Sequence, residues 1–330
     1  MNPKKIVVLG FGRSGTTWIA DIISKILGQL ILFEPIHPSV TDLAAKFSYS
    51  TVNGNELSES LKSFYADILS KQHRRKWLMR NHVPDRLEKI SESFLDILWE
   101  ECSIVGFKEI RANFLIEWFM KELNARIVFI MRHPGATVSS IKGRSNFWEF
   151  GWPETYNMFL KRTIYHDHYK DHQIANCLDV VERAETYAEQ CAVMWAITHA
   201  IALPELNRLG LPVFFYEEFY DLPFESSREL MRYLGYGDVN IHPSYLFTPS
   251  MTTLMTIHGI KIMEEERARQ GIAFFEEKLS KKELDDIMKI VTTFGITCYD
   301  LNGLVKPQDT EDGLVYPCTR VSPVEQNGAR

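Results

Sequence analysis

Glycines and hydroxyl side chains near the start of the chain have the chemistry of an anion-binding turn. Gly10, Gly12 and Gly15 follow an apolar run, and an apolar pattern with helical spacing begins directly after them. A strand, a glycine turn and a helix in this order let backbone N–H groups approach an anion, and the helix N-terminus adds partial positive charge. The side chains that can add donors to such a turn include Arg13, Thr16 and Thr17.

The spacing of Gly10 and Gly15 matches the phosphate loop of nucleotide kinases, G-x-x-x-x-G-K-[ST], but the lysine is missing. Thr16 occupies the lysine position, and the cation comes earlier, at Arg13. A loop without this lysine lacks the group that spans the β- and γ-phosphates of a triphosphate, yet it suits a shorter anion. The alternative is an ordinary turn between a strand and a helix, with no bound anion.

Other ionisable residues follow apolar runs that have the character of strands. Glu34 and Arg132 each come directly after such a run, and Lys108 lies near the end of another. In open α/β sheets, ligands bind at the carboxyl ends of the strands. Glu34 at this edge could act as a base, whereas the alternative is an exposed loop glutamate.

Apolar periodicity predicts alternating strands and helices, which favours a parallel sheet with helices on both faces. The strands are expected at about 4–9, 30–33, 77–79, 104–111, 126–131 and 211–216, and the main helices at about 18–27, 57–70, 114–120, 134–142, 187–202, 219–234 and 281–294. Gly28 is expected to end the first of these helices, and a capping box at Ser280 and Glu283 to open the last. The last 25 residues have few apolar groups, so we expect them to fray. The segments 39–56, 144–183 and 244–275 have weak periodicity. We expect 39–56 to be a surface loop or a lid over a substrate, and 244–275 to be irregular.

The composition restricts the class of protein. The chain has 330 residues, of which 45% are hydrophobic and 24% charged, as in ordinary globular proteins. A net charge of −6 argues against a nucleic-acid duplex as partner. No apolar run approaches the ~20 residues of a membrane span. The first strand leaves no room for a signal peptide, and five scattered cysteines without a C-x-x-C pair suggest reduced thiols, so we expect a cytoplasmic protein.

Three segments, in this order, resemble the sulfotransferases that use 3′-phosphoadenosine 5′-phosphosulfate (PAPS). The first, 12–18, is similar to the family's loop for the 5′-phosphosulfate. The second, 127–140, is similar to the 3′-phosphate motif, and the third, 215–219, to a Tyr-Glu-Asp-Leu segment whose tyrosine lies against the adenine in several members. The resemblance implies a PAPS site formed by Arg13, Ser14, Gly15, Thr16, Thr17, Trp18, Arg132, Ser140 and Tyr216.

The resemblance does not decide the catalytic base. In the small-molecule branch, the strand before the 3′-phosphate strand carries Lys-Thr-His, with the histidine as base, but here Ile110 stands in the histidine position. Phe33-Glu34-Pro35 instead resembles the Phe-Glu-Pro segment of carbohydrate sulfotransferases, whose relatives use a glutamate. This implies Glu34 as the base, with His37 and His82 as alternatives.

The resemblance implies a single sulfotransferase domain over 1–330, with a cofactor core at about 4–235 and a helical, irregular part at about 236–330. Arg13 and Lys108 would stabilise charge on the bridging oxygen, and no metal is required. The acceptor would carry a free hydroxyl, on a sugar, a lipid or a small-molecule natural product. The lack of a membrane anchor favours a bacterial-type cytosolic relative. The rival interpretations are a P-loop nucleotide kinase and a non-catalytic nucleotide-binding protein.

Overall fold

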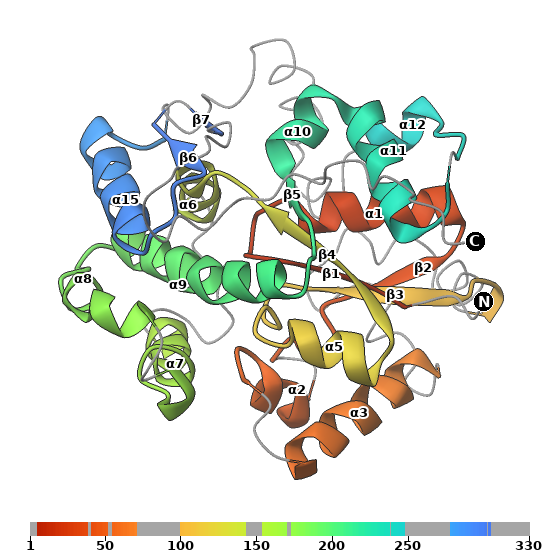
Figure 1. Cartoon of the computed structure of the whole chain (residues 1–330), viewed down its shortest axis with the longest axis horizontal. Helices are drawn as coiled ribbons and strands as arrows, with labels where there is room; N and C mark the ends of the chain where they lie inside the picture. Colours follow the sequence, from red (N-terminus) through yellow and green to blue (C-terminus); the bar gives the residue numbers. More distant parts are fainter. Residues whose placement is uncertain are drawn as a thin grey trace, which may run out of the picture.

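A five-stranded parallel sheet forms the middle layer of the molecule (Figure 1). The computed structural model describes residues 5–38, 41–51, 55–70, 100–142, 154–169, 173–237, 239–247, 278–301 and 303–304. The strand order is β2-β3-β1-β4-β5, and every neighbouring pair is parallel. The strands are β1 (Lys5–Gly10), β2 (Leu30–Phe33), β3 (Ile104–Glu109), β4 (Ala125–Met131) and β5 (Val213–Phe215). The predicted α/β class is confirmed.

The strands are apolar along almost their whole length because helices cover both faces of the sheet, as is usual for parallel sheets. One face packs against α1 (Thr16–Leu27), α10 (Tyr216–Asp221), α11 (Pro223–Leu234) and α12 (Pro243–Phe247). The helix α1 ends at Gly28, as its sequence predicts, because Gly28 takes the left-handed conformation that closes a helix.

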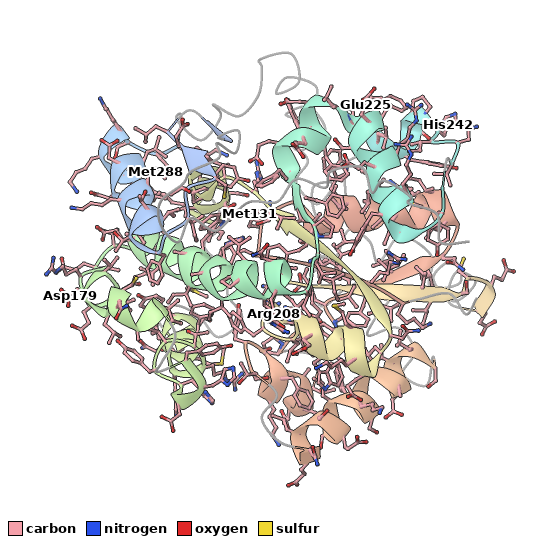
Figure 2. The ribbon with its side chains drawn as sticks, in the orientation of Figure 1. Met131, Asp179, Arg208, Glu225, His242 and Met288 are labelled. Atoms are coloured by element: carbon pink, nitrogen blue, oxygen red, sulfur yellow. The ribbon has the colours of Figure 1, made fainter. Side chains whose placement is uncertain are left out.

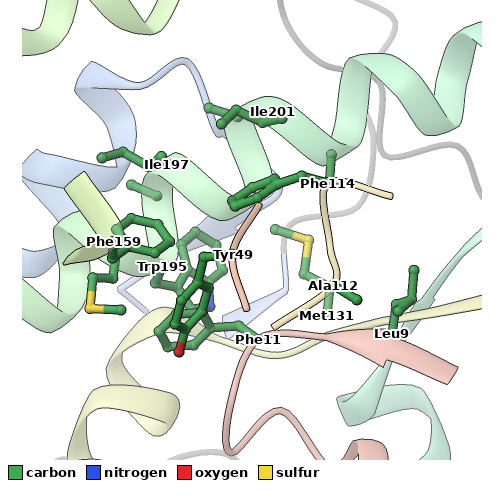
Figure 3. Close-up of a cluster of buried hydrophobic side chains, with 14 of the residues drawn as sticks. Leu9, Phe11, Tyr49, Ala112, Phe114, Met131, Phe159, Trp195, Ile197 and Ile201 are labelled. Atoms are coloured by element: carbon green, nitrogen blue, oxygen red, sulfur yellow. The ribbon is translucent and has the colours of Figure 1, made fainter. Parts of the chain in front are cut away.

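The opposite face packs against α3 (Asn55–Leu69), α5 (Ile116–Glu122) and α9 (Tyr187–Arg208). The long helix α9 is buried over most of its circumference and continues through Pro204. Figure 3 shows Trp195 of α9 beside Phe11, Tyr49 and Phe159, so this core reaches the end of β1. In Figure 2, Met131 at the end of β4 lies inside the molecule, whereas Asp179 and Glu225 lie outside.

Some helices lie where the sequence has weak periodicity. The segment expected as a loop or lid contains α2 (Asp42–Phe47), which Thr41 caps by accepting a hydrogen bond from the Ala44 N–H at 2.9 Å. The described residues of the segment 144–183 form four short helical elements that the periodicity did not reveal: α7 (Glu154–Arg162), η1 (Asp167–Tyr169), η2 (Gln173–Cys177) and α8 (Leu178–Glu182).

The described C-terminal part adds α15 (Lys281–Thr293) and a short antiparallel hairpin, β6 (Tyr299–Asp300) with β7 (Gly303–Leu304). The capping box predicted at Ser280 and Glu283 opens α15. The helix α6 (Pro134–Lys142) follows β4 and packs against α9 and α15. The expectations for a strand at 77–79, for His82 and for the last 25 residues lie outside the described residues. None of the helices described is both long and apolar enough to cross a membrane.

Candidate functional site

The turn between β1 and α1 has a backbone that only glycine accommodates at two positions. Gly10 has φ +153° and Gly15 has φ +86°. A Cβ atom at Gly10 would lie 2.4 Å from the Ile130 carbonyl oxygen, and one at Gly15 would lie 2.2 Å from Cδ2 of Tyr216. The glycines predicted from the sequence are therefore required by close contacts with β4 and α10.

The same turn presents donors that an anion can use. The N–H groups of Thr16, Thr17 and Trp18 belong to the first turn of α1, so they have no acceptor within the helix. The Ser14 hydroxyl is buried and has no hydrogen-bond partner among the described residues. These orphan donors at a helix N-terminus fit the phosphosulfate end of PAPS.

The first two motifs of the resemblance meet in space. Nε of Arg13 donates a hydrogen bond to the Ser140 hydroxyl at 3.0 Å. NH1 of Arg132 donates to the backbone carbonyl of Arg13 at 3.1 Å. Both arginines and Ser140 are half-buried. Two planar cations, each suited to bidentate binding of a phosphate, thus lie beside the glycine turn.

The third motif joins them. The Arg132 guanidinium carbon lies 4.3 Å from the centre of the Tyr216 ring, and this ring meets Trp18 edge-on at 5.6 Å between centroids. The Trp18 indole N–H donates to the Leu246 carbonyl at 3.2 Å, which ties α1 to α12. The structure thus brings together residues from the three segments whose order suggested the resemblance.

Asn113 braces the glycine turn, and the sequence interpretation missed it. Its Oδ1 accepts from the Gly10 N–H at 2.9 Å, while its Nδ2 donates to the carbonyls of Gly10 at 3.3 Å and Ile110 at 2.9 Å. The side chain is 2% exposed. A polar residue shortly after a predicted buried strand is the only sequence signal for this role.

A second unpredicted group holds the corner between β4 and α6, next to Arg132. The Glu217 carboxylate accepts from the His133 N–H at 2.9 Å and from the Tyr299 hydroxyl at 3.0 Å. His133 Nδ1 accepts from the Gly135 N–H, so its Nε2 carries the proton that is donated to the Asp300 carbonyl at 2.8 Å. The C-terminal hairpin therefore fixes the chain directly after Arg132.

Glu34 lies at the end of β2 in a buried ion-pair cluster. Its carboxylate pairs with the Lys108 ammonium and with NH1 of Arg111 at 2.6 Å. Its φ of +43° is unusual for a residue with a side chain. Burial alone would raise the pKa of Glu34, but Lys108, Arg111 and His37 outweigh this effect and lower it to about 2.

The alternative bases are placed differently. His37 is 2% exposed, and its backbone N–H donates to the Glu34 carbonyl at 2.9 Å, so the structure brings it into the neighbourhood of Glu34. His82 lies outside the described residues.

The Lys108 ammonium lies 4.1 Å from the centre of the Phe33 ring, which adds a cation–π contact to its ion pair.

Strand register joins the two parts of the site. Within the sheet, Val8 pairs with Lys108, Leu9 with Glu109, and Gly10 with Ile130. Because the strands are parallel, the glycine turn, the Lys108 cluster and Arg132 all lie at the carboxyl edge of the sheet.

A surface hollow of about 560 Å³ lies along α7 and includes Lys161, Arg162 and His166 in its lining. Arg162 NH1 also donates to the carbonyls of Ala45, at 3.0 Å, and Ser48. The Ser48 hydroxyl in turn donates to the Ile36 carbonyl at 2.7 Å, so hydrogen bonds connect this hollow to the loop after Glu34.

In the described part of the chain, no cluster of His, Cys, Asp and Glu has the arrangement of a metal site.

Comparison with known proteins gives matches among solved structures alone. No protein-family model and no curated protein matches the chain. A mouse sulfotransferase, SULT7A1 complexed with PAP, is 12% identical, with a TM-score of 0.38 over 88% of this chain and 84% of that chain. The sulfotransferase domain of the Synechococcus PCC 7002 olefin synthase is 14% identical, with a TM-score of 0.42 over 90% and 96%.

A third match, the sulfotransferase domain from the curacin biosynthetic pathway, is 13% identical, with a TM-score of 0.38 over 88% of this chain and 96% of that chain. All three are sulfotransferases, the family that the motifs of this chain resemble.

Proposed function

We propose that this protein transfers a sulfuryl group from PAPS to a hydroxyl of an acceptor. One observation carries the proposal: Arg13, Arg132 and Tyr216 come from three distant segments, and Arg132 contacts both of the others beside a glycine turn without the kinase lysine. This arrangement suits a nucleotide that has anionic groups at two positions and an aromatic base that Tyr216 can contact. The acceptor is a sugar, a lipid or a small-molecule natural product.

The residues divide the binding of the donor between them. The amides and hydroxyls of 14–17 would bind the 5′ end, Arg132 and Ser140 the 3′-phosphate, and Tyr216 the adenine. Trp18 positions Tyr216 through their edge-on contact. When bound, PAPS would supply the sulfuryl group together with its leaving bisphosphate. Arg13 and Lys108 would stabilise negative charge on the bridging oxygen, as preorganised donors do in a transition state.

Glu34 is our proposed base, with His37 as the alternative. A carboxylate that two cations hold at a pKa of about 2 is a weak base, so the pairs must loosen before it can take a proton. An anion beside Lys108 and Arg111 would compete for both cations and thereby raise the pKa of Glu34. In this proposal, donor binding itself prepares Glu34 to accept the hydroxyl proton.

The proposal includes a cytoplasmic location and a single domain with no required metal. The rival functions, nucleotide kinase and non-catalytic nucleotide binding, make different predictions. A kinase would need Mg²⁺ and the loop lysine, which is Thr16 here. A binder would hold the nucleotide without turnover.

Thermal unfolding in EDTA tests the donor site. Adenosine 3′,5′-bisphosphate should raise the melting temperature without Mg²⁺, because a ligand that binds only the folded state stabilises it. ATP in the same buffer is the control, and a shift with ATP but none with the bisphosphate would refute the proposal. Transfer of labelled sulfate from PAPS to a panel of hydroxyl acceptors then separates an enzyme from a binder.

A further inference from the structure

The surface hollow along α7 is lined by basic side chains. Its described lining consists of Asn157, Met158, Lys161, Arg162 and His166, and its volume is about 560 Å³. Asn157 and Lys161 are four residues apart, as are Met158 and Arg162, so one face of α7 supplies all four. The described lining includes a lysine, an arginine and a histidine but no carboxylate. We call this site the α7 hollow.

Arg162 contributes a guanidinium that forms no ion pair with any described residue. It is half-buried, and both of its hydrogen bonds to described residues come from NH1, to the carbonyls of Ala45 at 3.0 Å and of Ser48. A guanidinium has five N–H donors, so those of Nε and NH2 can still bind a ligand. Burial also lowers the pKa of Arg162, because the charged form loses hydration, and a bound anion would offset that loss.

Two further side chains of the α7 hollow add donors. Lys161 is exposed and forms no ion pair with any described residue. His166 is half-buried, and its Nδ1 accepts from the His168 N–H at 3.2 Å, so its Nε2 carries a proton that it can donate. A guanidinium, an ammonium and an imidazole N–H in one hollow suit an oxyanion, because hydrogen bonds from charged donors to such a group are the strong ones.

The α7 hollow is connected to the proposed base through a single segment, 45–49. Arg162 contacts this segment through two of its carbonyls. In the same segment, the Tyr49 N–H donates to the Arg111 carbonyl at 2.7 Å, and Arg111 pairs with Glu34 at 2.6 Å. An acceptor that has one end in the α7 hollow and its hydroxyl beside Glu34 must therefore extend past this segment.

We propose that the α7 hollow binds an oxyanion, a carboxylate or a phosphate, at the end of the acceptor remote from its reacting hydroxyl. This inference rests on the proposed function for the reaction at that hydroxyl, and it narrows the acceptor to an elongated anionic molecule. Arg162, Lys161 and His166 bind the anionic group, and Met158 contacts the apolar chain next to it. None of these residues touches a reacting atom, so they determine specificity and not the chemical step.

Sulfate transfer from PAPS to ω-hydroxycarboxylates of increasing chain length tests the proposal. The neutral control is the α,ω-diol of each length, and the ω-hydroxyalkyl phosphates show which oxyanion is preferred. Once the chain is long enough to reach the α7 hollow, kcat/KM should be about tenfold or more higher for the anion than for the diol. Shorter chains should show no such preference. A series in which neither anion is preferred over the diol at any length would overturn the proposal.

Lys161→Gln removes one cation and leaves the contacts of Arg162 with the segment 45–49 in place. The preference for the anion over the diol should fall by about two- to fivefold, as expected for an exposed charge, and by more in Arg162→Gln. Lys289→Gln is the matched control, because Lys289 is also an exposed helical lysine, in α15, without an ion pair to a described residue. An unchanged preference in Lys161→Gln, or an equal loss in Lys289→Gln, would refute the proposal. If Arg162→Gln does not fold, Lys161→Gln decides.

Calorimetry of a long ω-hydroxycarboxylate with the protein in the absence of donor separates this proposal from the proposed function. The wild-type protein should bind the carboxylate more tightly than Lys161→Gln does. If it does so but transfers sulfate to no hydroxyl, the proposed function fails while the α7 hollow remains an oxyanion site. If sulfate is transferred to diols and hydroxycarboxylates alike, the proposed function holds and the inference about the α7 hollow fails.

Discussion

The single carboxylate of Glu34 forms ion pairs with two buried cations, so substitution of Glu34 affects both stability and chemistry. Removing one partner of a buried pair leaves the others uncompensated, whereas an exposed pair of the same composition contributes little. The chain contains both situations: Glu34 is buried and Glu117 lies at the surface, and each pairs with one lysine and one arginine. The comparison of these two sites isolates the effect of burial.

Glu34→Gln should lower the free energy of unfolding by about 3–5 kcal/mol, because Lys108 and Arg111 lose their charge partner. If Glu34 is the base, the single-turnover rate should also fall by roughly 10²–10⁴. Urea unfolding and rapid-quench sulfate transfer measure the two effects. Glu117→Gln, which loses surface pairs with Lys121 and Arg208, should change each measurement little. A Glu34→Gln variant that retains full turnover, with His37→Ala inactive, would transfer the role of base to His37.

Arg132→Ala should weaken binding of adenosine 3′,5′-bisphosphate by about 1.5–3 kcal/mol more than binding of adenosine 5′-phosphosulfate, which lacks the 3′-phosphate. Calorimetry with both ligands measures the difference. Arg126→Ala is the control, since Arg126 lies in β4 and also contacts a carbonyl and a tyrosine ring, both of Tyr233. Equal losses for the two ligands in Arg132→Ala would make Arg132 structural.

The turn between β1 and α1 depends on two elements far along the chain, β4 and α10. Its glycines meet Ile130 and Tyr216, so space as well as backbone conformation limits the residues that fit. The glycine that ends α1 has a similar conformation, but no atom lies within 4 Å of a Cβ placed there. A pair of substitutions at Gly15 and Gly28 therefore separates strain from steric conflict.

Gly15→Ala should abolish measurable binding of the bisphosphate, because the new methyl group would displace Tyr216 from its place beside Arg132 and Trp18. Gly28→Ala should cost roughly 1–2 kcal/mol of stability from the left-handed conformation alone and should leave binding intact. Thermal unfolding with and without ligand measures both effects. Intact binding in Gly15→Ala would show that Tyr216 does not contribute to the site.

At the scale of the whole molecule, buried histidines connect the fold to acid stability. Burial lowers the pKa of His133 to about 4 and that of His199 to about 3. His199 donates from Nδ1 to the Trp195 carbonyl, while its Nε2 is buried without a partner among the described residues. Since the unfolded chain binds these protons more readily, this contribution is present above pH 6.5 and is lost as the pH falls toward the folded pKa values.

The wild-type protein should therefore lose stability between pH 7 and pH 5 through its neutral buried histidines, by about 2 kcal/mol for each one. His199→Leu should remove about this amount from the pH dependence. Glu109 acts in the opposite direction in this range, because its raised pKa favours the folded state as the pH falls. The quantity to compare is therefore the free energy of unfolding in urea, taken as the difference between wild type and variant at each of the two pH values. Parallel curves for wild type and His199→Leu would show that His199 has the same pKa in the folded and the unfolded chain.

The sequence by itself predicted the strands and helices of the core and the glycine turn that begins it. These features depend on neighbouring residues: the spacing of apolar side chains, a glycine that ends α1, and the capping box of α15. It also singled out Arg13, Arg132 and Tyr216, because their order along the chain resembles a known family. Their contacts are consistent with that resemblance, and their roles in binding remain predictions.

Only the tertiary structure decided which charges meet. Glu34 and Arg111 are 77 positions apart, and they pair because β2 lies beside β3 in the sheet. The supports from Asn113, Glu217 and Tyr299 likewise depend on strand order and on where the C-terminal hairpin packs. Local patterns do not encode these contacts, because an ion pair or a buried hydrogen bond depends on distance in space and on burial, which only the packed chain defines.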